Sequence, residues 1–131
     1  MSTVYTLRLV IPDSVWLTSN GRYHWAQKAR ATRELRDIAA LSARVAHLPR
    51  LHRAHITALI QYRTTGRAYR ANSYPTVKAC IDGLVSDYGL LPGDDHEYLA
   101  GPDMRRAPGK APRGQRIVTL QITDLGTEFP A

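Results

Sequence analysis

The sequence predicts a single α/β (α+β) domain in which two helices lie between the strands of a mixed sheet. The chain has 131 residues, 44% of them hydrophobic, which is enough for one core and too few for two typical domains. Apolar residues alternate in several short segments, as in strands, and recur every three or four positions in two longer segments, as in helices. The predicted order is β-α-β-α-β-β, with each helix returning between strands to pack on the sheet.

The segment at residues 3–11 has the alternating pattern of a strand with one apolar face. Pro12 and Asp13 would end this strand, and a loop at residues 19–21 follows. The predicted apolar face consists of Tyr5, Leu7, Leu9 and Ile11.

From about residue 24 to residue 46 the apolar period changes to three and four residues, which predicts an amphipathic helix. Its predicted buried stripe consists of Trp25, Ala29, Thr32, Leu35, Ile38, Ala39, Ser42 and Val45. Its opposite face would carry Arg30, Arg33, Asp37 and Arg44. After Pro49, a second strand is predicted at residues 55–63. Its buried face would hold Ile56, Ala58, Ile60 and Tyr62.

The second helix is predicted at residues 75–88. Pro75 suits its first turn, Asn72 or Ser73 would supply the capping oxygen, and Gly89 stands where a C-terminal glycine is expected. The predicted apolar stripe consists of Val77, Cys80, Ile81, Leu84 and Tyr88.

Two more strands are predicted at residues 97–100 and 116–123, on either side of a basic segment. Five cationic side chains and no acids occur from Arg105 to Arg116, together with several Gly and Pro residues. We therefore expect residues 104–116 to form an exposed, mobile hairpin arm of the single domain at 1–131.

The charge of the chain indicates the kind of partner that it binds. The formal net charge is +7 and the sequence pI is about 10.0, which favours a polyanion, nucleic acid before membrane. The alternative is that the charge serves solubility alone. The cations fall into three groups, around residues 20–30, 63–70 and 105–116. The predicted DNA-binding residues are Arg22, His24, Lys28, Arg30, Arg63, Arg67, Arg70, Arg105, Arg106, Lys110 and Arg113.

The remaining composition argues for a soluble, intracellular protein without a zinc site. The single Cys80 lies in an apolar helical pattern and is expected to be a small buried hydrophobe in a reducing compartment. No signal peptide or membrane-spanning run is expected. One cysteine and scattered histidines give no zinc pattern, and no phosphate-cradling glycine loop or Ser/His/Asp triad is evident.

The chemistry-bearing pattern lies at residues 72–95. Lys78 and Asp82 are four residues apart on the predicted helix and so share one face, and Asp94 and Asp95 follow the turn after that helix. Carboxylates suit Mg²⁺ or Mn²⁺, and a lysine beside them would neutralise charge on a phosphate. The alternatives are a surface ion pair for Lys78 and Asp82, and ordinary turn chemistry for the paired aspartates.

These segments resemble the RusA family of Holliday junction resolvases, especially its bacteriophage-encoded members. The resemblance covers most of the chain. It rests on an Asn-x-Arg-x-His-Trp segment at residues 20–25, an Arg-rich helix, the block YPTVKACIDGLVSDYGLLPGDD and the closing basic segment. The central block is the most specific part of the likeness.

The resemblance implies a small homodimer that uses Mg²⁺ to nick opposed strands of a four-way DNA junction in the cytoplasm of a phage-infected bacterium. Lys78 matches the family's essential lysine, Asp95 matches the acid after the central helix, with Asp94 beside it, and Asp82 matches an acid inside the helix. The implied catalytic set is therefore Lys78, Asp95, Asp82 and Asn72, and the implied metal ligands are Asp95, Asp94 and Asp82.

The chain departs from the family in one place. RusA-like resolvases carry Asp-x-Asp-Asn immediately before the central helix, and the matching positions here are Asn72 and Tyr74. This departure leaves open a catalytically impaired member that binds branched DNA without cutting it. A further interpretation is a phage protein-interaction module whose basic charge is incidental.

Overall fold

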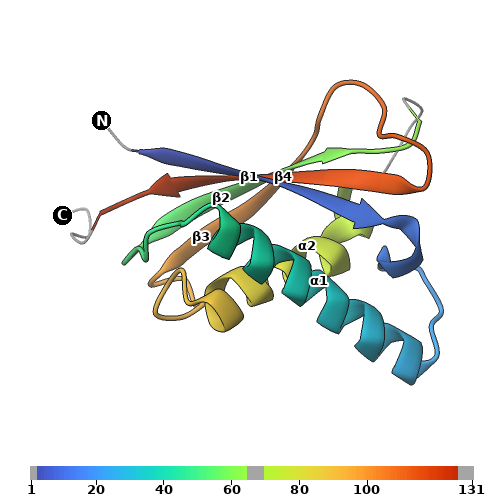
Figure 1. The fold of residues 1–131 in the computed structure, drawn as a ribbon, viewed down its shortest axis with the longest axis horizontal. Helices are drawn as coiled ribbons and strands as arrows, with labels where there is room; N and C mark the ends of the chain where they lie inside the picture. Colours follow the sequence, from blue (N-terminus) through green and yellow to red (C-terminus); the bar gives the residue numbers. More distant parts are fainter. Residues whose placement is uncertain (1–2, 65–69, 127–131) are drawn as a thin grey trace.

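The strands and helices of the computed structural model follow one another in the predicted order. The structure describes residues 3–64 and 70–126, with the side chains of residues 70 and 71 left out. Two helices lie together on one face of a four-stranded sheet, making one small α+β domain (Figure 1). The main elements are β1 (Val4–Pro12), α1 (Trp25–Val45), β2 (Ala54–Gln61), α2 (Tyr74–Asp82), β3 (Leu99–Arg106) and β4 (Gln115–Asp124).

The last strand, β4, lies inside the sheet. The strand order is β1-β4-β2-β3; β4 runs antiparallel to both of its neighbours, and β2 and β3 are parallel. The sheet is therefore mixed, as predicted.

The basic segment at 104–116 is not a hairpin. β3 runs on to Arg106, and β2 separates β3 from β4, so the strands on either side of residues 107–114 are not neighbours. The connection instead crosses the end of β2, where Ala107 N donates to Ile60 O at 2.8 Å and Ala111 N to Tyr62 O at 2.6 Å. Ala111 is buried. The prediction failed because hairpins join adjacent strands, whereas here the returning strand inserts on the far side of β2.

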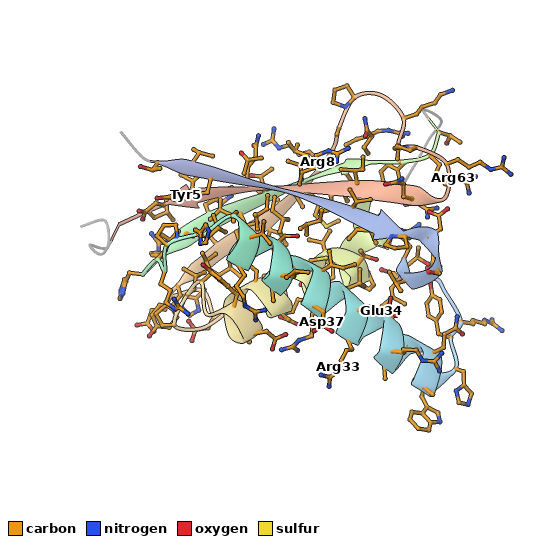
Figure 2. The ribbon with its side chains drawn as sticks, viewed as in Figure 1. Tyr5, Arg8, Arg33, Glu34, Asp37 and Arg63 are labelled. Carbon is orange, nitrogen blue, oxygen red and sulfur yellow. The ribbon has the colours of Figure 1, made fainter. Side chains whose placement is uncertain are left out.

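The predicted strand faces are confirmed. The side chains buried between sheet and helices include Leu7, Leu9, Ile11, Ile56, Ala58, Ile60, Val118, Leu120 and Ile122. Burial of each large apolar side chain among them contributes roughly 1.5–3 kcal/mol. No helix within residues 3–64 and 70–126 covers the other sheet face; Figure 2 shows Arg8 on it, and Val4 and Val10 are exposed.

The buried stripe of α1 differs from the prediction. Leu35 and Ala39 are buried as expected, but Trp25 is 77% exposed and Val45 is 72% exposed. Four of the five buried α1 residues are alanines: Ala31, Ala39, Ala40 and Ala43. The helix has 21 residues and is about 32 Å long. Its buried residues begin only at Ala31, so its first turns extend past the core (Figure 1), whereas Val45 lies on the outer face two residues from the fully buried Ala43. Small residues line the part that does pack.

The second helical segment continues past α2 as a π-helical turn. Gly83–Tyr88 forms this turn, and Gly89 ends it with a left-handed backbone (φ 88°), as predicted for the C-terminal glycine. A Cβ on Gly83 would lie 2.2 Å from the backbone oxygen of Arg36, so only glycine allows α1 to approach this closely. Ser73 occupies the N-cap position, but neither predicted oxygen caps the helix. No helix of the described residues is long and apolar enough to cross a membrane.

Candidate functional site

The helix that carries the candidate site is anchored at its start by two side chains. Thr76 is fully buried, and its hydroxyl accepts a hydrogen bond from Leu17 N at 2.8 Å and donates one to Leu17 O at 2.7 Å. Ser73 Oγ lies 2.7 Å from Tyr62 Oη, which explains why it does not cap the helix. These bonds tie α2 to the loop after β1 and to the end of β2.

The two faces of α2 divide structural from chemical side chains. Val77, Cys80 and Ile81 are buried, and burial raises the pKa of the Cys80 thiol to about 12, so this cysteine is a core residue as predicted. Lys78 and Asp82 lie on the opposite face and remain partly exposed.

Lys78 lies between two carboxylates. Its Nζ is 2.7 Å from Asp82 Oδ1 and 3.2 Å from Asp94 Oδ2, so the two acidic oxygens lie within about 6 Å of each other. The pKa of the Lys78 ammonium is raised, mainly by the hydrogen bond to Asp82. Partial burial lowers this pKa, and the hydrogen bond to Asp94 raises it further. Lys78 is therefore a cation and a hydrogen-bond donor at neutral pH.

Asp95 has a different role in the local structure from its neighbour Asp94. Its Oδ1 accepts a hydrogen bond from Glu97 N at 3.1 Å, and its backbone oxygen accepts from Tyr98 N and Leu99 N. This is the turn chemistry that was the alternative reading of the aspartate pair. In residues 3–64 and 70–126, no group of three or more His, Cys, Asp or Glu side chains is placed to hold a metal ion.

The side chains present nevertheless suit a hard divalent cation. Asp82 and Asp94 supply two neighbouring carboxylates on an exposed surface, and Mg²⁺ commonly takes one or two carboxylates with waters and phosphate oxygens. A surplus of one negative charge remains when Lys78 is counted with them.

Asn72 lies beside the loop that was predicted to bind DNA. Its Oδ1 accepts a hydrogen bond from Asn20 Nδ2 at 3.3 Å, and its backbone oxygen accepts one from Ser19 N at 2.9 Å. The structure thus brings together two segments that the sequence singled out separately.

A second ion pair lies next to the Lys78 cluster and was not predicted. Arg36 on α1 donates to both carboxylate oxygens of Asp87, at 2.8 and 2.9 Å. The hydrogen bond to Asp87 raises the pKa of Arg36 and lowers that of Asp87, and the charge of Asp82 adds a smaller increase for Arg36. No local signal links residues 36 and 87, because their contact depends on how the two helices cross.

The predicted DNA-binding cations occupy two parts of the molecule. Arg22, His24, Lys28 and Arg30 are exposed at the start of α1, where His24 Nδ1 caps the helix by accepting from Ala26 N. A groove of about 690 Å³ begins there; its lining includes Trp25, Lys28, Arg33 and Arg36, and Asp37 and Asp87. Figure 2 shows Arg33, Glu34 and Asp37 along this helix.

The remaining cations lie at or near one end of the sheet. Arg63 follows β2, Arg105 and Arg106 end β3, and Lys110 and Arg113 are exposed on the connection to β4. Arg67 lies outside the described residues. Arg70 begins a short 3₁₀ turn at Arg70–Ser73, and its side chain is outside the described part.

Comparison with known proteins does not assign the chain to a family. No family model matches the sequence, and no curated protein matches it. The functional conclusion therefore depends on the residues and their geometry.

Proposed function

We propose that this protein is a metal-dependent, structure-specific DNA endonuclease of the RusA-like type that cuts four-way junctions in DNA recombination and repair. The observation that carries the proposal is the contact of Lys78 Nζ with both Asp82 and Asp94. It joins the helical and post-helical parts of the motif into one cluster in a chain of net charge +7.

Each residue of the cluster has a distinct task in this proposal. Asp82 and Asp94 would hold Mg²⁺ or Mn²⁺, and Asp95, which follows Asp94, and the side-chain oxygen of Asn72 would be the further oxygen donors. Such a metal, when bound, polarises the phosphoryl group and lowers the pKa of the attacking water. Lys78, whose pKa is raised, keeps its protons and donates to a phosphate oxygen as negative charge develops there. It stabilises charge and does not act as a base.

The test is nicking of a synthetic four-way junction with Mg²⁺ or Mn²⁺. We expect nicking by the unaltered protein and its loss in Asp94→Asn and Asp95→Asn. Glu34→Gln, which removes an exposed carboxylate from α1 (Figure 2), is the matched control and should nick normally. Intact junctions over a range of metals and pH values would refute the proposal.

The resemblance also leads us to propose a homodimer that works in the cytoplasm of the infected host. Two copies would present two Lys78 clusters, one for each of the opposed strands of a junction. Sedimentation equilibrium should give twice the mass of 14.6 kDa. A monomer that still nicks both strands would contradict this assembly.

A junction-binding protein that does not cut is the second candidate, and Asn72 favours it. The family places acids at the positions of Asn72 and Tyr74, and here an amide contacts Asn20 instead. In that case junctions bind with steeply salt-dependent affinity but stay intact. Tyr74 is 43% exposed, so it accepts substitution without loss of core packing. The double variant Asn72→Asp, Tyr74→Asp should then gain nicking, whereas continued inactivity would count against a lost metal ligand as the cause.

A further inference from the structure

A second charged cluster lies at one end of the sheet, away from the acids on α2. Pro12 pairs with Gln115 and Gln61 pairs with Ile117, so the end of β1, the end of β2 and the start of β4 meet there. Asp13 follows β1, and its two oxygens take one arginine each. Arg116 Nη1 lies 2.7 Å from Asp13 Oδ1, and Arg63 Nη1 lies 3.3 Å from Asp13 Oδ2.

Aromatic rings hold two guanidinium groups of this region in place. The guanidinium of Arg116 lies 5.1 Å from the centre of the Trp16 ring, and that of Arg106 lies 5.2 Å from the centre of Tyr62. The two rings themselves meet edge to face at 6.3 Å. A cation stacked on a ring is attracted to the ring face, and a planar guanidinium in this position keeps most of its hydrogen-bond donors free.

The cluster borders a hollow on the surface. Its volume is about 460 Å³, and Tyr62, Arg63, Thr64 and Arg116 line it. The side chain of Arg63 is 48% exposed and that of Arg116 is 26% exposed. Each arginine makes its ion pair with Asp13 through one nitrogen atom, and a guanidinium carries five N–H donors, so both arginines keep donors for a ligand in the hollow.

Positive charge exceeds negative charge strongly in this region. The segments 12–17, 61–64 and 105–117 contain six arginines and lysines and one acid, Asp13. The connection 107–114, drawn as an arch in Figure 1, is fixed beside the hollow: Asp13 N donates to Gly114 O at 3.0 Å, and Gln61 Nε2 donates to Pro108 O at 2.9 Å. Lys110 and Arg113 are exposed on it, and Figure 2 places Arg63 at this end of the sheet.

We propose that this hollow binds a backbone phosphate of the DNA, at a contact separate from the phosphate that is cut at Lys78. The inference rests on the proposed function in taking DNA as the partner. Paired guanidinium groups match the oxygens of a phosphate, and Asp13 keeps both arginines oriented while leaving a net positive charge. The site is joined to the start of α2 by hydrogen bonds between Tyr62 Oη and Ser73 Oγ and between Leu17 and the Thr76 hydroxyl. A DNA strand bound both in this hollow and at Lys78 would be held at two points, which would fix its direction on the protein.

Trp16 provides a direct reporter for this site. The chain has two tryptophans, so the variant Trp25→Phe leaves only Trp16, whose ring contacts Arg116. DNA is titrated into this variant without divalent metal, and the fluorescence of Trp16 should change saturably. The same titration is made with inorganic phosphate alone.

Variants at the two arginines give the quantitative test. We expect Arg116→Gln and Arg63→Gln each to weaken DNA binding about tenfold, which corresponds to about 1.4 kcal/mol, and to reduce the salt slope by about one. Arg116→Lys keeps the charge but not the planar fork, and should fall between. Arg44→Gln, an exposed arginine in the last turn of α1, is the matched control and should bind normally. Thermal unfolding followed by circular dichroism checks that each variant is folded.

The outcomes separate this inference from the proposed function. Normal affinity and salt slope in folded Arg116→Gln and Arg63→Gln would overturn the phosphate site, even if the protein nicks junctions. Saturation of the Trp16 signal by inorganic phosphate but not by DNA would also overturn it. Weakened binding in these variants with no nicking by the unaltered protein would support the site while refuting the nuclease.

Discussion

The two charged clusters of this protein are built in opposite ways. On α2 one cation, Lys78, is held by two carboxylates, whereas at the end of the sheet one carboxylate, Asp13, is held by two arginines. In each cluster the central group forms an ion pair with both neighbours but neutralises only one of their two charges. A net charge of −1 remains around Lys78, and a net charge of +1 remains around Asp13. The first cluster is thus suited to a metal cation and the second to a phosphate.

The two central groups, Lys78 and Asp13, are expected to behave differently when a ligand binds. A bound metal would neutralise the two carboxylates that now pair with Lys78. The Lys78 ammonium would then be free to donate hydrogen bonds to the phosphate. Asp13 would not contact the phosphate, because its negative charge repels the phosphate that the arginines attract. Removing Lys78 should therefore harm function, and removing the charge of Asp13 should not.

The largest expected effect follows from Lys78→Ala. Loss of a donor aimed at developing charge commonly reduces the rate by about 10²–10³-fold, so nicking of a saturating junction should fall by that factor. Single-turnover nicking assays with Mg²⁺ measure this, with Arg44→Ala as a cation-removing control. An unchanged rate in Lys78→Ala would mean that its contacts with Asp82 and Asp94 form only a surface ion pair.

A structural effect of similar size is expected at the residue that lies between the clusters. Thr76→Val removes both hydrogen bonds to Leu17, next to Trp16, and leaves two buried backbone groups without partners. Each such group costs roughly 1–3 kcal/mol, so the free energy of unfolding should fall by about 2–6 kcal/mol. Urea denaturation measures it. Thr32→Val is the control, because that hydroxyl only bonds the Lys28 carbonyl within α1. Equal losses in the two variants would contradict the anchoring role of Thr76.

A smaller effect of the opposite sign is expected from Asp13→Asn. The substitution keeps a hydrogen-bond acceptor but removes the one acid in segments 12–17, 61–64 and 105–117, which surround the hollow. DNA should therefore bind about two- to fivefold more tightly, as for a change of about 0.5–1 kcal/mol. Fluorescence anisotropy at low salt measures the affinity. Weaker binding would show that orientation of the arginines by Asp13 matters more than its negative charge. Asp13 would then be needed for function, as Lys78 is.

The smallest effect concerns the titration of Lys78. Because Asp82 raises its pKa, the ion pair stabilises the fold fully below the ordinary lysine pKa, and this contribution is lost as the pH rises through the raised value. NMR titration of the lysine side chain should show the raised pKa, and Asp82→Asn should lower it. The stability difference between this variant and the unaltered protein should be constant near neutral pH and shrink in strong alkali. A pKa unaffected by Asp82→Asn would exclude the pair as its cause.

Local sequence patterns were sufficient to predict the helices and strands and part of each charged cluster. Alternation alone identified the buried face of β1, and the four-residue spacing on a helix was enough to place Lys78 beside Asp82. The same reasoning placed the ends of α1 within one residue but misassigned part of its buried stripe, because it counted the large apolar Trp25 and Val45 as buried where the packed face consists mostly of alanines. It also missed that α2 ends in a π-helical turn, where Gly83 allows the close approach of α1.

Contacts that depend on strand register could not be predicted in this way. Asp13 and Arg116 are separated by 103 residues, and Arg36 and Asp87 by 51. The pairing of Asp13 with Arg116 requires that β4 pair with β1, a choice made by the whole sheet, and the pairing of Arg36 with Asp87 depends on how α1 crosses the second helical segment. Arg116 was accordingly counted as one cation of an arm, and Asp13 as the end of a strand.

The interior position of β4 has a consequence for how this protein folds. In the described part of the chain β1 pairs only with β4, and β4 lies between β1 and β2, so the sheet cannot form in the order in which the chain is synthesised. Closing so long a loop is an entropic cost that precedes any favourable pairing, and folding dominated by distant pairs is slow. Until β4 arrives, β1 exposes an apolar strand with both edges open, a state prone to association with other chains.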